Sequence, residues 1–242
     1  MKSEGLIIKN YRLCICAALF MLHSTCFLAE CSAQQDPEYR LEIGAGVGAL
    51  TYLGDYNGNP LKEIQPMGSV LAKYRFTPRQ ALALNIGYGQ LKGSSRNVKT
   101  YYPQTEPYSF KSSVVDAGLR YEYNFWPYGT GQEYRGAKRL TPYIYIGMGM
   151  TIAKPDHGEA KTVTAFNVPL GGGVKYKVGN RVNLGLEWTI HFTTSDLLDG
   201  MKDPYGIQSS GMFKNTDCYS QLRASVTYDL WQKCKTCHND SD

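Results

Sequence analysis

Charge, histidine and long hydrophobic runs are all scarce in this chain of 242 residues, and each shortage excludes a class of protein. Charged residues make up 19% of the sequence, against about 25% in an ordinary soluble domain. The net charge of +5 is diffuse, and no run of Lys and Arg is interleaved with aromatic residues, so nucleic acid is not an expected partner. The 25 glycines and the lack of sustained heptads exclude a coiled coil. A hydrophobic content of 43% excludes a disordered chain.

Apolar runs long enough for a transmembrane helix are missing after the first 33 residues. Residues 1–33 have the layout of a cleavable signal peptide, with basic residues up to Arg12, an apolar stretch from Leu13 to Ala29, and small residues before Gln34. A retained membrane anchor and a lipoprotein with a lipidated Cys31 are the alternatives. The sequence therefore predicts an exported protein with a signal peptide over residues 1–33.

Cysteine is also scarce once the signal peptide is removed. Only Cys218, Cys234 and Cys237 remain of the seven cysteines, which is too few for a disulfide framework. The run from Cys234 to His238 spells the attachment motif of c-type haem, but only four residues follow it, so no haem domain can form there. A metal site at these residues would lack a fourth ligand. We expect a local disulfide or pairing with a partner instead, and no cofactor.

The strongest positive signal is period-two alternation of apolar and polar residues. Tyr39–Leu50, for example, places Leu41, Ile43, Ala45, Val47 and Ala49 on one face of a strand. The pattern recurs in residues 39–50, 67–76, 81–90, 112–125, 142–153, 165–178, 181–192 and 218–230. These lengths match tilted membrane strands and exceed the usual 5 to 6 residues of a globular strand.

The composition of the two faces indicates which one points outward. The apolar faces carry no charge, as expected of a surface in contact with lipid. The opposite faces are rich in glycine and in charges of both signs, which suits a narrow lumen where glycine leaves room for long side chains and opposite charges pair. The residues predicted to face the lumen are Gly44, Gly46, Gly48, Gly87, Gly89, Gly147, Gly149, Gly171 and Gly173 with Arg40, Glu42, Arg75, Asp116, Arg120, Glu122, Glu187 and Arg223. The sequence thus predicts an all-β fold, an eight-stranded antiparallel outer-membrane β-barrel, over residues 34–230, followed by a periplasmic tail, 231–242. A soluble barrel, with its apolar faces inside, is the structural alternative.

Aromatic residues at the strand ends predict two girdles at the membrane interfaces. One girdle comprises Tyr39, Tyr74, Phe76, Tyr123, Phe125, Tyr176, Tyr228 and Trp231, and the other Tyr88, Phe166, Trp188, Phe192 and Tyr219. The connections follow the same rule, since those on the inner side are mostly short. Two features fit less well: the link Trp126–Thr141 is long for an inner turn, and Pro169 lies inside a strand, where it predicts a bulge or a later strand start.

Candidate catalytic and metal residues are few. His191 could be paired with Ser195 as in lipid-modifying barrel enzymes, but Ser195 lies in a long loop and nothing in the spacing secures a contact. A hydrogen-bonding histidine in the lumen is the simpler interpretation. Asp196, Asp199 and Asp203 are interpreted as solvated loop carboxylates rather than a calcium site. We therefore predict no catalytic, cofactor-binding or metal-binding residue and no small-molecule substrate.

Several stretches resemble the PorG-like barrels of the type IX secretion system. These are Tyr52 to Tyr56, Lys73 to Phe76, Asn85 to Gly93, Thr141 to Tyr143, and Asn183 to Trp188 followed by Ser195 to Asp199. In the last run Ser195 and Leu197 stand where the family has Thr and Tyr. The matches span about residues 41 to 200 in the family's order.

The resemblance implies a non-enzymatic structural subunit that contacts the periplasmic ring proteins PorK and PorN and tethers them to the outer membrane. The link Trp126–Thr141 and the tail Trp231–Asp242 are the expected contact segments. Two alternatives come from other classes. One is an adhesion barrel acting through outer loops 91–111 and 193–217, and the other is a lipid-modifying enzyme that uses His191.

Overall fold

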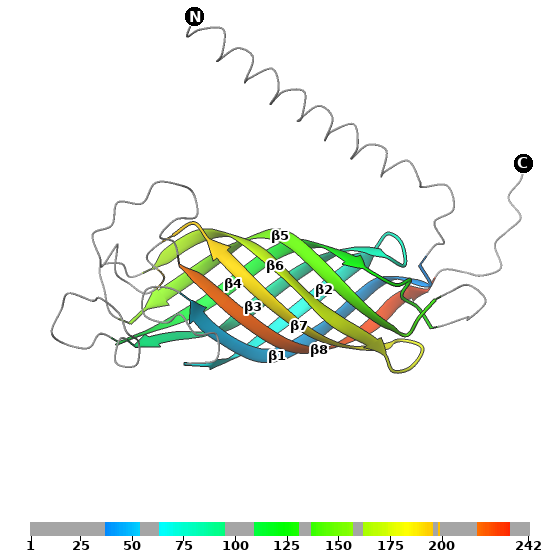
Figure 1. Ribbon diagram of the computed structural model, residues 1–242, viewed down its shortest axis with the longest axis horizontal. Coiled ribbons are helices and arrows are strands. Elements are labelled where there is room, and N and C mark those ends of the chain that lie inside the picture. Colours follow the sequence, from blue (N-terminus) through cyan, green and yellow to red (C-terminus); the bar gives the residue numbers. More distant parts are fainter. Residues whose placement is uncertain are drawn as a thin grey trace, which may run out of the picture. The chain divides into compact units, whose positions relative to one another are not determined.

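The structure is a computed structural model that describes residues 37–53, 63–94, 109–130, 137–156, 162–195, 198 and 217–232. Over these residues the chain forms eight antiparallel strands, each paired with the next, and the last strand pairs with the first to close a barrel (Figure 1). The strands are β1 (Tyr39–Leu53), β2 (Gln65–Arg75), β3 (Gln80–Ser94), β4 (Ser109–Asn124), β5 (Leu140–Pro155), β6 (Val163–Lys177), β7 (Val182–Thr193) and β8 (Cys218–Gln232).

All eight predicted strands are confirmed, and most of them are longer than the alternation indicated. β4 and β5 each contain 16 residues, and β8 continues to Gln232, two residues into the segment assigned to the tail. Strand pairing persists at the ends because backbone hydrogen bonds do not require an alternating side-chain pattern. In the part of the chain that the structure describes, no helix is long and apolar enough to cross a bilayer.

The two ends of the barrel differ in how the strands are connected. At one end, here called the terminal rim, β1 begins and β8 ends (Figure 1). Tight turns there join β2 to β3 and β6 to β7, with hydrogen bonds from Phe76 N to Gln80 O (3.0 Å) and from Val178 N to Val182 O (2.9 Å). The third connection at this rim, between β4 and β5, is long and covers residues 125–139. The opposite end, the loop rim, carries the connections between β1 and β2, β3 and β4, β5 and β6, and β7 and β8.

The outer face of the barrel is apolar between the two rims. Ile146 on β5 is 55% exposed and Leu186 on β7 is 57% exposed. Exposed charged side chains on the strands lie only near the strand ends, at Arg40, Lys92, Lys111 and Lys154. A Lys or Arg at the bilayer midplane would cost about 2–4 kcal/mol, and the middle of this surface has none among the described residues. The predicted outward orientation of the apolar faces is confirmed, and the barrel has the surface of a membrane-spanning protein.

Pro169 does not have the predicted effect on β6. The β5–β6 ladder has no pairs at Val168 and Pro169, but it resumes in the same register, from Ile146↔Leu170 to Gly149↔Asn167. On the other side Pro169 pairs with His191 in an unbroken ladder with β7. The prediction of a bulge or a later strand start is therefore wrong. The missing N–H of proline affects the ladder locally, and the pairs on both sides of it maintain the register.

Three residues assigned by alternation occupy other positions. Arg40 was predicted to face the lumen but is exposed, because the lumen ends at the rim and leaves a residue there open to solvent. Tyr39 was assigned to an exterior girdle but is 3% exposed, and its ring lies 5.0 Å from the Lys177 ammonium. Tyr219 was assigned to the other exterior girdle but is fully buried on the inner face. There it stacks on His191 with ring centroids 4.3 Å apart.

The other aromatic residues predicted to form the girdles are on the exterior. Those at the terminal rim are exposed, and so are three of those nearer the loop rim, while Phe192 is half-buried. They are Tyr74, Phe76, Tyr123, Phe125, Tyr176, Tyr228 and Trp231 at the terminal rim, and Tyr88, Phe166 and Trp188 toward the loop rim. Amphipathic rings at both interfaces are typical of outer-membrane barrels.

Candidate functional site

The lumen is filled by buried charges of both signs. On the strands, five acidic and six basic side chains are less than 8% exposed. They are Glu42, Asp116, Glu122, Glu187 and Asp229, with Lys73, Arg75, Arg120, Lys175, Lys177 and Arg223. Burying isolated ions would be prohibitive, so each charge needs a partner and the rest of its hydrogen bonds. The contacts below show how these requirements are met.

Glu187 is the centre of the largest charged cluster. Both its carboxylate oxygens accept from Arg120, with Nη1–Oε1 of 2.9 Å and Nη2–Oε2 of 3.1 Å. The Arg223 guanidinium pairs with the same carboxylate, and the Tyr143 hydroxyl donates to it at 2.8 Å. Two guanidinium groups thus share one carboxylate, and the bidentate geometry orients Arg120 on it.

A second group of ion pairs lies toward the terminal rim. Arg75 pairs with Glu42 and with Asp229, the latter with Nη2–Oδ1 of 3.0 Å. Asp229 also pairs with Lys177. Further along the lumen, Glu122 lies 3.1 Å from Lys73 Nζ, 3.5 Å from Arg120 Nε and 3.6 Å from Lys175 Nζ. Because Arg120 pairs with both Glu122 and Glu187, the contacts around Glu122 are connected to the Glu187 cluster.

The lumen glycines provide the space for these side chains. A Cβ at Gly46 would lie 2.9 Å from Arg223 Cδ, and one at Gly147 would lie 2.8 Å from Arg120 Cβ. At Gly173 a Cβ would lie 2.8 Å from Glu187 Cβ. At these positions the lumen glycines make room for charged residues, but those residues belong to the neighbouring strand and do not reach over from across the lumen as predicted.

Tyr128 covers the terminal end of the lumen. It belongs to the link between β4 and β5, where Gly129 N donates to Lys138 O at 3.2 Å and Tyr128 N donates to Pro78 O at 3.0 Å. Its hydroxyl donates to Asn183 Oδ1 at 2.8 Å, and its ring lies 5.2 Å from the Arg75 guanidinium. Burial raises the pKa of the Tyr128 phenol, which therefore stays protonated at neutral pH. Part of the long link thus folds back as a cap over the lumen.

The surface of the terminal rim is basic. Arg40, Arg79, Lys138, Arg139 and Arg181 are exposed there. Among the described residues at this rim no acidic side chain is exposed, because Asp229 is buried and Glu38 is half-buried and accepts from Thr130 N at 3.1 Å. The Lys138 ammonium lies 4.6 Å from the exposed Trp126 ring. This pair is the most prominent outward-facing feature of the described part of the link.

His191 belongs to a hydrogen-bonded network toward the loop-rim end of the lumen, made of neutral side chains and Asp116. Its Nε2 lies 3.1 Å from Gln221 Oε1, and its Nδ1 lies 3.7 Å from Asp116 Oδ2. Asp116 also accepts from the Tyr219 hydroxyl at 2.9 Å and from Asn167 Nδ2 at 2.7 Å. The imidazole is 3% exposed. This is the hydrogen-bonding histidine predicted for the lumen, and its burial keeps it away from a lipid substrate.

An apolar cluster fills the loop-rim end of the lumen. Its members are Leu50, Tyr52, Met67, Leu91, Phe110, Val114, Ala153, Val163, Leu198 and Tyr219. Leu198 comes from the connection between β7 and β8 and is fully buried, with its N–H donating to Asp217 Oδ2 at 2.9 Å. The Tyr52 hydroxyl donates to the other oxygen of Asp217. A residue from a loop therefore closes the lumen at this end, as Tyr128 does at the other.

The structure confirms most of the predicted lumen charges and adds four more. Glu42, Arg75, Asp116, Arg120, Glu122, Glu187 and Arg223 are buried as predicted. Lys73, Lys175, Lys177 and Asp229 were not singled out. Strict alternation from Arg75, Gly173 and Arg223 would have placed all four on the inner faces. Cys234, Cys237, His238, Asp196, Asp199 and Asp203 lie outside the described residues.

The chain has detectable relatives both in sequence and in structure. Residues 18–239 match the family model described as a domain of unknown function, DUF6089. No curated protein matches the chain. Solved structures of other proteins also match it, three of them as follows.

The Neisserial surface protein A aligns with 16% identity over 78% of this chain and 97% of its own, with a TM-score of 0.48. Ail of Yersinia pestis, solved with the heparin analogue sucrose octasulfate, aligns with 10% identity over 81% and 100%, with a TM-score of 0.45. OprG of Pseudomonas aeruginosa aligns with 9% identity over 81% and 98%, with a TM-score of 0.44. With TM-scores below 0.5, these likenesses assign no function to this chain.

Proposed function

We propose that this chain, which belongs to the DUF6089 family, is a structural subunit of the type IX secretion machinery in the outer membrane. In this role it neither conducts solutes nor catalyses a reaction. Its partners would be the periplasmic ring proteins PorK and PorN. The proposal combines the sequence resemblance to PorG-like barrels with the geometry of the lumen and of the terminal rim.

The observation that carries the proposal is the filled lumen. An eight-stranded barrel leaves an interior only wide enough for side chains. Here ion pairs, Tyr128 and the apolar cluster around Leu198 occupy that interior. His191, the only buried histidine among the described residues, is engaged with Gln221 and Asp116. A barrel of this kind acts through its outer surfaces and not through its lumen.

The terminal rim is the surface best suited to a periplasmic partner. Two of the three connections at this end are tight turns, and short periplasmic turns are typical of outer-membrane barrels, which supports a periplasmic position for the terminal rim. Trp126 is exposed at this rim beside Lys138, and an exposed Trp is a common anchor in protein interfaces. We therefore assign the ring contact to the link Trp126–Thr141, together with the tail 231–242.

The experiment is a pull-down of the tagged protein from its native outer membrane in mild detergent, with co-purifying proteins identified by mass spectrometry. The wild type is expected to recover PorK and PorN. The double variant Trp126→Ala/Lys138→Glu should lose them while remaining folded. The matched control Trp188→Ala/Lys154→Glu makes the same changes away from the terminal rim and should retain them.

The structure also shows why a small substitution is better than a deletion here. Removing residues 129–138 would break the Gly129–Lys138 hydrogen bond and disturb the cap formed by Tyr128. Loss of the ring would then be ambiguous between a lost contact and a damaged barrel. Recovery of the wild-type barrel without PorK and PorN would remove the secretion role and leave the adhesion alternative, which acts through the loop rim.

A further inference from the structure

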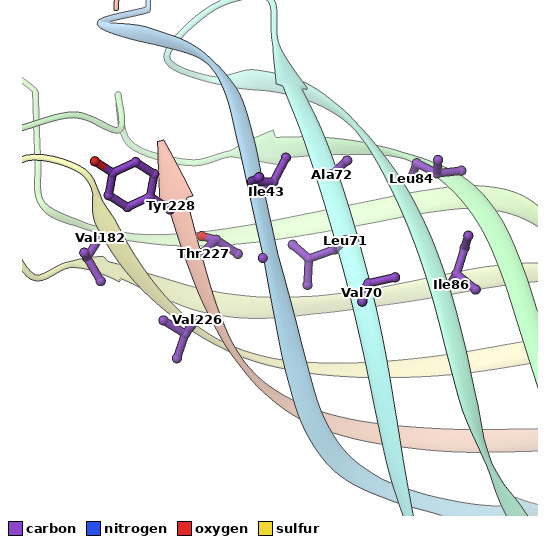
Figure 2. Close-up of a pocket in the computed structure, with 11 residues that line it drawn as sticks. Ile43, Val70, Leu71, Ala72, Leu84, Ile86, Val182, Val226, Thr227 and Tyr228 are labelled. Carbon is purple, nitrogen blue, oxygen red and sulfur yellow. The ribbon is translucent and has the colours of Figure 1, made fainter. Parts of the chain in front are cut away.

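An apolar groove runs along the outer face of the barrel from the terminal rim. It has a volume of about 570 Å³ and is lined by residues of β7, β8, β1, β2 and β3, as Figure 2 shows. Ile43, Val70, Ala72, Val226 and Tyr228 are among the outward-facing residues that form it. Its volume lies within the range of small-ligand sites, roughly 300–1,000 Å³.

Ala72 is the smallest of the outward-facing residues that line the groove. Its partners across the two ladders are the larger Ile43 on β1 and Leu84 on β3, so its short side chain leaves a hollow between them. On the opposite side of the barrel, β5 presents bulky residues along its middle, Ile144, Ile146, Met148, Met150 and Ile152.

A cation, Arg181, stands at the terminal-rim end of this groove. Arg181 immediately precedes Val182, which lines the groove, and its Nη1 lies 3.4 Å from the hydroxyl of Tyr228, which also lines it. A hydrogen bond from Asp229 N to Arg181 O (2.7 Å) ties the residue to β8. The guanidinium also lies 3.4 Å from Gln232 Oε1 and 5.8 Å from the Tyr39 ring, which are neutral groups. Among the described residues, no carboxylate lies within ion-pair distance of it.

We propose that the groove and Arg181 form a binding site for one phospholipid of the surrounding leaflet. An acyl chain lies in the groove and the lipid phosphate accepts from the Arg181 guanidinium. The position of the groove within the apolar outer face dictates an apolar occupant, and the guanidinium matches the geometry of a phosphate. The remaining exposed basic residues of the terminal rim attract anionic headgroups in the same leaflet.

A second copy of this chain is the competing occupant, and the charge of the rim argues against it. Two barrels packed through this face would bring two basic rims together, with no exposed acidic residue among the described rim residues to offset them. A phospholipid satisfies both the apolar groove and the cation at its end. The proposal does not depend on the secretion role, because it requires only that the barrel spans a membrane.

The experiment is a titration of the delipidated full-length protein in mild detergent, followed by native mass spectrometry. The probes are 1-palmitoyl-2-oleoyl-phosphatidylglycerol and a diacylglycerol with the same chains but no phosphate. Arg181→Gln should weaken the first phosphatidylglycerol by about fivefold, the effect of one basic residue at an anionic lipid surface, and leave diacylglycerol unchanged. Ala72→Phe fills the groove with an apolar side chain and should weaken both probes.

Two matched variants control for general effects on the barrel surface. Arg139→Gln removes another exposed cation of the same rim, and Val174→Phe enlarges an outward side chain on β6, away from the groove. Both should bind the two probes as the wild type does. An equal loss of phosphatidylglycerol affinity in Arg181→Gln and Arg139→Gln would overturn the proposed site, because the effect of Arg181 would then be non-specific attraction between the basic rim and an anionic lipid. A wild-type dimer that becomes monomeric in Ala72→Phe without bound lipid would also overturn it and assign the groove to a second copy.

Discussion

The terminal half of the lumen is filled by ion pairs, whereas the loop half is filled by aromatic and aliphatic side chains. Around Glu187, every charge depends on a particular partner at a particular distance. Around Leu91 and Phe110, apolar side chains pack together and fill space. The comparison teaches that one barrel can be closed by two kinds of core, which should respond differently to mutation.

The largest effect is expected at Glu187, where Glu187→Ala leaves Arg120 and Arg223 buried without their shared carboxylate. Removing one partner of a buried ion pair costs about 3–5 kcal/mol, since an uncompensated charge remains. The free energy of unfolding can be measured by urea titration of the barrel in lipid vesicles. A loss below about 1 kcal/mol would show that water enters the lumen and solvates the arginines, and the comparison between the two halves would then fail.

A smaller loss is expected in the apolar half. Leu91 is fully buried in the loop-rim cluster, so Leu91→Ala should cost about 2–4 kcal/mol, depending on how far its neighbours close around the cavity. The same urea titration applies. The conservative variant Leu91→Met should cost less than about 1.5 kcal/mol because it nearly conserves volume. Similar losses of unfolding free energy for Leu91→Ala and Leu91→Met would indicate that the apolar half of the lumen is sensitive to side-chain shape as well as to volume.

The smallest effect is expected at the cap. Tyr128→Phe removes the hydrogen bond to Asn183 but keeps the ring over Arg75, so the loss should be about 1 kcal/mol at neutral pH. The folded pKa of Tyr128 is raised above the unfolded value by burial, so its stabilisation is complete below pH about 10 and is lost as the pH rises further. The difference in the free energy of unfolding between the wild type and Tyr128→Phe should therefore narrow in alkaline solution. A constant gap from pH 8 to pH 11 would contradict the burial of the phenol.

Much of this architecture could be predicted because alternation is a local property of the sequence. The residues of β5, for example, alternate between bulky apolar side chains and glycine, threonine or tyrosine, and this pattern alone assigned both its faces. The exceptions lie where the local rule no longer applies. At Arg40 and Tyr39 the strand has reached the rim, and the direction of a side chain there depends on what covers the lumen. At Pro169 the neighbouring pairs maintained a register that proline alone would weaken.

The candidate site was predictable in its residue types but not in its contacts. Alternation indicated that Glu187 and Arg120 share the lumen, yet they are 67 residues apart and on strands that are not adjacent. No sequence spacing reveals that Arg223 binds the same carboxylate. The caps were missed for a related reason. Tyr128 and Leu198 lie in connections, where no periodic pattern distinguishes a side chain that enters the barrel from one that faces solvent.

The sequence by itself determined the number of strands, the lipid-facing and inner faces, and the presence of both charged residues and glycines on the inner faces. These properties follow from a two-residue period and from the cost of charge in lipid. Only the tertiary structure decided which ions pair, which loop residues close the two ends, and where the outer face is hollow. Closing the barrel brings distant strands within a few ångströms of each other, and the contacts across the lumen and around the wall depend on that closure and on the register of all eight strands.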